Sequence, residues 1–130
     1  MPALRLEHVA FNVSDPVAAA AWYVANLGMR VARKVDVSPY MHFVADASNS
    51  MLIELYSNPL AAVPEYPAKN PLELHLAFAT NDPDGDRAAL VAAGATFVDE
   101  STLADGSRLV MLRDPWGLAL QLCQRKSPIL

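Results

Sequence analysis

The chain has 130 residues, of which 53% are hydrophobic and 18% charged, a composition typical of one compact folded domain and not of a disordered chain. The net charge of −4 and the absence of a Lys/Arg run argue against nucleic-acid binding. No apolar stretch reaches about 18 residues and no signal peptide is evident, so we expect neither a membrane span nor export. The single cysteine, Cys123, excludes an internal disulfide framework and favours the cytoplasm.

The first half of the chain predicts a strand, a helix and three further strands. Apolar and polar residues alternate over residues 4–13, so His8 faces away from the side that packs on a helix. Asp15-Pro16 is a helix start, with Asp15 as the N-cap, and Gly28 follows the last helical residue. The next strands are expected at about 30–37, 40–46 and 50–56.

The second half predicts the same order of elements. Residues 57–71 contain four prolines and are interpreted as a connector, with a wall or lid over a site as the alternative. Asp82 caps a helix over about 83–93. The strands of this half are expected at about 72–80, 95–100, 107–113 and 118–124.

A repeat with one fixed offset relates the two halves. His75-Leu76-Ala77-Phe78 repeats His8-Val9-Ala10-Phe11, and Asp82-Pro83 repeats Asp15-Pro16 (75 − 8 = 67 and 82 − 15 = 67). The same offset carries Glu54 onto Gln121. The chain therefore predicts an α+β fold of two tandem βαβββ modules within a single domain, residues 1–130. Module one covers about 1–58, the linker about 59–71 and module two about 72–126.

Four polar residues of this repeat are candidate metal ligands. Taken singly, His8, Glu54, His75 and Gln121 are each compatible with an ordinary half-exposed strand position. Taken together, two imidazoles and one carboxylate are a common donor set for a divalent transition metal. An amide oxygen can complete the protein donors and leave room for water or substrate.

The chain resembles the vicinal oxygen chelate superfamily, which includes glyoxalase I, bleomycin resistance proteins, extradiol dioxygenases and methylmalonyl-CoA epimerase. The residues that carry the resemblance are His8–Asp15, Asn26-Leu27-Gly28, Ile53-Glu54-Leu55, His75–Phe78, Ala93-Gly94-Ala95, and Asp114-Pro115-Trp116-Gly117 followed by Gln121. The resemblance implies a cup-shaped, curved sheet that holds a divalent cation (Zn, Ni, Co, Mn or Fe) at the four ligand positions His8, Glu54, His75 and Gln121. Many members have Glu where this chain has Gln121.

The function that this resemblance favours is a metal-dependent lyase or isomerase acting on a small oxygenated substrate. The metal is the Lewis acid, Glu54 is the base, and His42 is the spare acid–base candidate. The alternatives are an Fe(II) extradiol-type dioxygenase, which the set His8, His75 and Glu54 permits, and a non-catalytic binding or resistance protein. We expect a homodimer. The substrate stays open, as does whether the cup closes within one chain or across the dimer.

Overall fold

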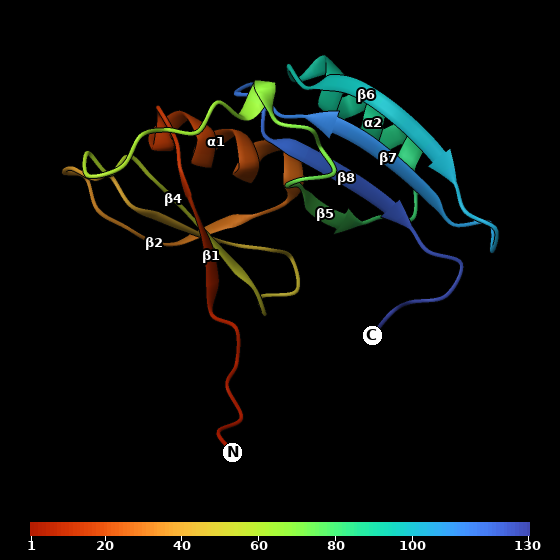
Figure 1. Ribbon diagram of the computed structural model, residues 1–130, viewed down its shortest axis with the longest axis horizontal. Coiled ribbons are helices and arrows are strands. Elements are labelled where there is room, and N and C mark those ends of the chain that lie inside the picture. The colour runs from red at the N-terminus through yellow and green to blue at the C-terminus, as the bar shows by residue number, and fades with distance from the viewer. The chain divides into compact units, whose positions relative to one another are not determined.

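The computed structural model describes residues Met1–Leu130, which divide into two compact units, Met1–Pro64 and Glu65–Leu130. Each unit holds one four-stranded sheet and one α-helix (Figure 1). The order of elements is βαβββ in each, so the predicted α+β class and the tandem modules are confirmed. Neither helix has the length and apolar character needed to cross a membrane.

Unit 1 forms its sheet around a parallel pair of strands. Its elements are β1 (His8–Asn12), α1 (Pro16–Leu27), β2 (Arg30–Lys34), β3 (His42–Ala45) and β4 (Leu52–Tyr56). The strand order is β1-β4-β3-β2, in which β1 runs parallel to β4 and the other pairs are antiparallel. The first strand of the module thus lies beside its last, with α1 as the crossover.

Unit 2 repeats this topology after a short 3₁₀ helix at Tyr66–Ala68. Its elements are β5 (Leu76–Ala79), α2 (Pro83–Ala92), β6 (Thr96–Thr102), β7 (Arg108–Arg113) and β8 (Ala119–Gln124). The strand order is β5-β8-β7-β6, again with the first and last strands parallel.

Both helices begin and end where the sequence predicts. The Asp15 carboxylate accepts a hydrogen bond from the Ala18 amide at 3.0 Å, and the Asp82 carboxylate accepts one from the Gly85 amide at 3.0 Å. Gly28 closes α1 at φ 64°, a left-handed conformation that a side chain would strain.

Each helix covers one face of its own sheet, and the core of each unit lies between that helix and that sheet. In unit 1 the fully buried Tyr23 of α1 belongs to the same core as Val44 and Leu55. In unit 2 the corresponding core includes the buried side chains of Leu90, Val110, Leu112, Leu120 and Leu122. Because side chains alternate along a strand, the intervening residues project from the face that no helix covers.

The first strand of each unit is shorter than predicted. Pairing of β1 begins at His8 because its register partner, Leu52, is the first residue of β4. Residues 4–7 therefore have no neighbouring strand to pair with. In unit 2 the segment before β5 is a turn, in which the Glu73 amide donates to the Asn70 carbonyl at 2.9 Å.

The proline-rich stretch 59–71 is divided between the units. Its first part is held in unit 1, where the Asn12 side-chain amide donates to the Ala61 carbonyl at 2.9 Å. Its second part is held in unit 2, where Arg113 donates to the carbonyls of Tyr66 and Lys69 at 3.0 and 2.7 Å. The predicted connector therefore consists of two segments, each held by hydrogen bonds to its own unit.

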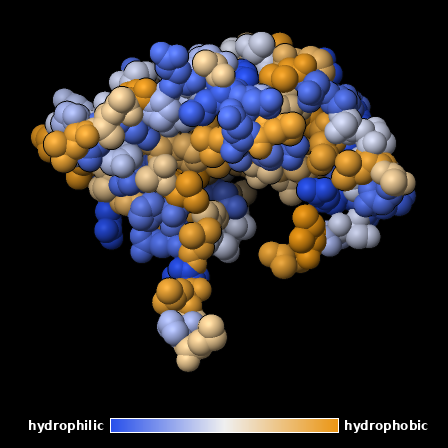
Figure 2. Space-filling view, viewed as in Figure 1, coloured by the Kyte–Doolittle hydropathy of each residue, from blue (hydrophilic) through white to orange (hydrophobic).

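Both ends of the chain expose apolar side chains. Leu4 and Leu6 are exposed at the N-terminal end, and Ile129 and Leu130 at the C-terminal end. The extended ends marked N and C in Figure 1 carry orange, hydrophobic atoms in Figure 2. Such exposed groups are candidates for burial against a ligand or a partner.

Candidate functional site

In unit 1 the structure brings together His8 and Glu54. Their strands pair in parallel, with Ala10 opposite Glu54, so both side chains project from the face that α1 does not cover. His8 Nε2 lies 3.9 Å from Glu54 Oε1, too far for a hydrogen bond. The side chains are 33% and 14% exposed, so both donors are partly sheltered and still accessible.

The His8 ring is oriented by its neighbours. Its Nδ1–H donates to the Glu7 carboxylate at 3.0 Å, which leaves Nε2 on the side of Glu54. The Phe43 ring meets the imidazole edge-on, with 5.1 Å between ring centroids, and Phe43 is the cross-strand neighbour of Glu54. A carboxylate on the second ring nitrogen is a common way of orienting a metal-binding histidine.

In unit 2 the equivalent positions hold His75 and Gln121. Ala77 lies opposite Gln121 in the β5–β8 register, as Ala10 lies opposite Glu54 in unit 1. His75 Nδ1–H donates to the Pro71 carbonyl at 2.7 Å. Because a carbonyl only accepts, this bond fixes the tautomer and leaves the Nε2 lone pair free for a ligand bond.

The Gln121 side chain has one hydrogen-bond partner on its own strand. The thiol of Cys123 donates to Gln121 Oε1 at 3.3 Å. Burial raises the pKa of Cys123, so the thiol stays protonated and serves as the donor at neutral pH. The amide oxygen, rather than the amide nitrogen, is thereby assigned to the Cys123 side.

The loop that carries Pro71 is seated by β7 and the turn after it. Arg113 spans three carbonyls, those of Tyr66 and Lys69 in the loop and that of Gly117 at 2.9 Å. Gly117 has φ 95°, and a Cβ at this position would lie 2.3 Å from Pro67 Cγ. Only glycine allows this approach, which explains the glycine of the Asp114–Gly117 turn.

The structure places His42 on the other face of the unit 1 sheet. It lies opposite Leu55 in the β3–β4 register and is 4% exposed, on the side of the helix-covered core. Its Nδ1 donates to the Tyr40 carbonyl at 2.7 Å. The sheet therefore lies between the His42 and Glu54 side chains, and the acid–base role of His42 stays a prediction that this placement does not support.

A divalent cation fits the donors that each unit presents. Within either unit no group of three or more His, Cys, Asp and Glu side chains gathers, so each unit by itself presents a pair of donors. Donors about 2.1 Å from a shared cation lie roughly 3.0–3.4 Å apart, and the His8–Glu54 separation of 3.9 Å is within a small side-chain adjustment of this range. Both histidines keep Nε2 unengaged, as metal ligands require.

The strongest charge cluster of unit 2 is structural. Arg108 of β7 donates to Asp84 of α2 and to Glu100 of β6, so it ties the helix to the sheet. This guanidinium holds the pKa of Asp84 below its ordinary value. Beside it, the Arg87 guanidinium lies 3.4 Å from the centre of the Phe97 ring. None of these groups projects from the face that carries Gln121.

The sequence pattern does not identify several residues that support the site. Glu7 adjoins His8 in the sequence, and that adjacency was the available signal. Arg113 and Pro71 are far from each other in sequence and act through backbone carbonyls, so no side-chain pattern points to them.

Two βαβββ modules with register-equivalent polar pairs define a protein of the vicinal oxygen chelate type. The family described as the glyoxalase-like domain matches residues 8–123, nearly the whole chain, and the protein belongs to this family. No curated protein has a significant sequence match to it.

Solved structures share the fold over almost the full length. A protein designated SMU.1112c is 28% identical, with a TM-score of 0.70 over 95% of this chain and 99% of its own. TnmS3, an antibiotic binding protein from Streptomyces sp. CB03234, is 22% identical, with a TM-score of 0.75 over 97% and 99%. A glyoxalase family protein from Bacillus cereus is 18% identical, with a TM-score of 0.80 over 95% of each chain.

Proposed function

We propose that this protein is a divalent-metal-dependent lyase or isomerase acting on a small oxygenated substrate. The proposed ligands are His8 and Glu54 in unit 1 and His75 and Gln121 in unit 2. The observation that carries the proposal is the His8–Glu54 pair, with the donors 3.9 Å apart and the opposite ring nitrogen of His8 held by Glu7. The matching tautomer of His75 supports it.

Within this proposal the acid–base work falls on Glu54. A bound cation supplies Lewis-acid polarisation of substrate oxygens. Glu54 is the only carboxylate of the four ligands, and it is sheltered enough to take a proton from carbon next to a carbonyl. Gln121 cannot accept a proton and His42 lies on the far face of its sheet. The proposal is therefore a one-base reaction.

Metal binding is the first test. The purified protein, stripped with a chelator, is titrated calorimetrically with Ni²⁺, Co²⁺, Zn²⁺ and Mn²⁺, and metal content is checked by mass spectrometry. We expect one ion per chain, and at least about tenfold weaker binding in each of His8→Ala and His75→Ala. His42→Asn is the matched control and keeps full affinity. Wild-type protein that binds none of these ions contradicts the proposal.

The role of Glu54 is separable from metal retention. Glu54→Gln keeps an oxygen ligand of the same shape but cannot take a proton. We expect this variant to bind metal within about tenfold of wild type and to lose turnover on any substrate found by screening. Full turnover in this variant refutes Glu54 as the base.

A second candidate function is ligand binding without chemistry. It is favoured by the structural likeness to TnmS3, an antibiotic binding protein, together with a pocket in unit 2 described below. Ligand affinity that is unchanged by His8→Ala and by metal removal would select this function.

We also propose a cytoplasmic homodimer. The exposed Leu4 and Leu6 give apolar surface that a partner copy would cover. Light scattering at micromolar concentration tests the dimer, and a monodisperse monomer rejects it.

A further inference from the structure

Besides the change from Glu54 to Gln121, the internal repeat is broken at the end of the uncovered faces of the two sheets. In unit 1 Asn12 lies opposite Tyr56, the last pair of the β1–β4 register. The offset of 67 puts Ala79 and Cys123 at these positions, and they too are register partners. Two large side chains in module one are thus replaced by two small side chains at the equivalent positions of module two.

In unit 1 the larger side chains are used to hold the chain. The Asn12 amide donates to the Ala61 carbonyl at 2.9 Å, and its oxygen accepts from the Asn58 amide at 2.7 Å. These bonds keep the segment after β4 against β1.

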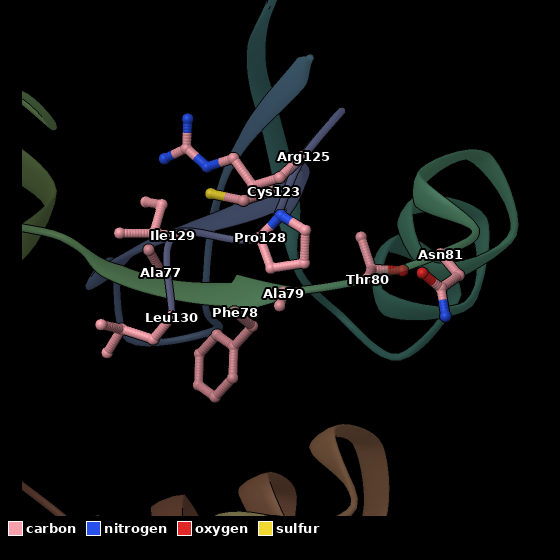
Figure 3. A pocket seen from close by; sticks show the side chains of 10 residues that line it. All are labelled: Ala77, Phe78, Ala79, Thr80, Asn81, Cys123, Arg125, Pro128, Ile129 and Leu130. Carbon is pink, nitrogen blue, oxygen red and sulfur yellow. The ribbon is translucent and has the colours of Figure 1, made fainter.

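In unit 2 the small side chains leave a pocket of about 540 Å³ beside the edge strand β5. This volume is within the usual range of small-ligand sites. Its lining includes Pro128, Ile129 and Leu130 of the C-terminal segment (Figure 3). No regular backbone pairing joins this segment to β5.

The lining is mostly apolar, with the polar side chains of Thr80 and Asn81 and one charged side chain. Ala77 and Ala79 are exposed, and Ile129 keeps 76% of its surface accessible, so apolar area is available for a ligand to bury. Arg125 is the charged residue of the lining, and Figure 3 shows its side chain on the same side of β5 as Cys123 and Ile129.

Arg125 is free to meet an anion. It makes no ion pair or hydrogen bond in the structure. Asp105 is near enough for Arg125 to help lower its pKa, but the larger cause is hydrogen bonding from Ser107, whose amide donates to the carboxylate at 2.8 Å. A guanidinium without an ion-pair partner beside apolar walls suits a ligand that has both an apolar body and an anionic group.

We propose that this pocket binds a small organic anion, with the apolar body against Ala77, Ala79 and Cys123 and the carboxylate or similar group at Arg125. Ala77 is the register partner of Gln121, so the pocket adjoins one of the proposed metal ligands. Its role as a substrate subsite rests on the proposed function. Its capacity to bind such an anion does not.

Two fluorescent probes separate the apolar and anionic contributions. 1-Anilinonaphthalene-8-sulfonate carries the anion, and N-phenyl-1-naphthylamine has the same skeleton without it. Both are titrated into chelator-treated full-length protein. We expect one site for each probe. Arg125→Gln weakens the sulfonate probe by about fivefold and leaves the neutral probe within about twofold.

A matched pair of alanines tests the location. Ala77→Phe fills the pocket and is expected to weaken both probes at least about tenfold. Ala10→Phe places the same ring at the equivalent exposed position of unit 1 and leaves both affinities unchanged. The sulfonate probe should also slow alkylation of Cys123, the only thiol of the chain, by N-ethylmaleimide.

Three results overturn the proposal. The first is equal probe affinity in wild type and Ala77→Phe. The second is an equal loss of affinity for both probes in Arg125→Gln. The third is probe binding that is seen only after Ile129→Ser has converted a dimer to a monomer. The last result would make the pocket an interface between copies. Since these titrations are metal-free, a failure of metal binding leaves them intact, and the two proposals fail independently.

Discussion

Arg113 is expected to control the metal affinity of His75 without touching that residue. Its guanidinium donates to Tyr66, Lys69 and Gly117 carbonyls, and so fixes the loop whose Pro71 carbonyl accepts the His75 Nδ1 proton. The perturbation is Arg113→Met, which keeps the length and apolar stem of the side chain and removes the donors.

The magnitude follows from the three bonds. Hydrogen bonds from a charged donor contribute about 1.5–3 kcal/mol each when sheltered. The bond to Lys69 is exposed and adds little, so only the two half-buried bonds are counted, each at the lower end of this range. We expect Arg113→Met to lower the free energy of unfolding by about 2–4 kcal/mol. Loosening the partner of a metal-binding histidine typically weakens the metal about tenfold or more, and the same is expected here.

Three measurements distinguish this role from general destabilisation. Urea unfolding gives the stability change, calorimetry gives the metal affinity, and long-range ¹H–¹⁵N spectra report the His75 tautomer. Arg113→Lys retains one charged donor and should recover part of the stability. Arg5→Met, an exposed arginine of unit 1 without a hydrogen bond, should change neither stability nor affinity.

The reasoning fails if Arg113→Met unfolds within about 0.5 kcal/mol of wild type, because three charged hydrogen bonds cannot be lost at so small a cost. It also fails if stability falls while the His75 tautomer and the metal affinity of the folded protein stay the same. That outcome would leave Arg113 as a loop anchor only.

Three further predictions concern Asn12 in unit 1 and Asp84 and Cys123 in unit 2. Asn12→Ala should lower the unfolding free energy by about 1–3 kcal/mol in urea, because the backbone amide of Asn58 and three carbonyls lose a shared partner. The pKa of Asp84 is depressed by Arg108, so this pair stabilises the fold above pH 4 and the effect is lost as pH falls through the lowered pKa. When the pH falls from about 5 to about 2.5, a range that spans the ordinary carboxyl pKa, the unfolding free energy of Asp84→Asn should therefore decrease less than that of wild type. Alkylation of Cys123 at pH 8 should be slower than that of a free thiol and should rise beyond about pH 9, since burial raises its pKa; a rate equal to that of free cysteine would contradict its burial.

The fold and the pairing within each module could be predicted because they depend on local signals and one offset. Asp15 and Asp82 cap their helices as expected, and the register repeats between Ala10–Glu54 and Ala77–Gln121. Strand pairing in the same order brings the same offsets into register, so a sequence repeat becomes a structural one.

The face of His42 could not be predicted, because it depends on register. A shift of one residue in a strand pair moves every side chain to the opposite face. The pairing of β3 with β4 puts Phe43 opposite Glu54 and turns His42 inward. The turn at residues 46–51 sets this register, and its Asn49 takes a positive φ of 62° that no periodicity reveals.

The division of 59–71 was hidden for a different reason. Its two halves are fixed by Asn12 and Arg113, which are distant in sequence and bind backbone carbonyls. Carbonyl groups are common to every residue, so composition shows four prolines and a loop but not the anchors. Long-range contacts to backbone leave no signal in the segment that is bound.

The departures from the repeat carry more information about function than the repeat itself. Unit 1 keeps a carboxylate at Glu54 and fills the end of its open face with Tyr56. Unit 2 has an amide at Gln121 and a small residue at Cys123, beside a pocket. In our proposal the first module specialises in proton transfer and the second in holding the substrate. This predicts that Glu54→Gln lowers turnover more than it lowers probe affinity. It also predicts that Ala77→Phe lowers probe affinity more than it lowers metal affinity.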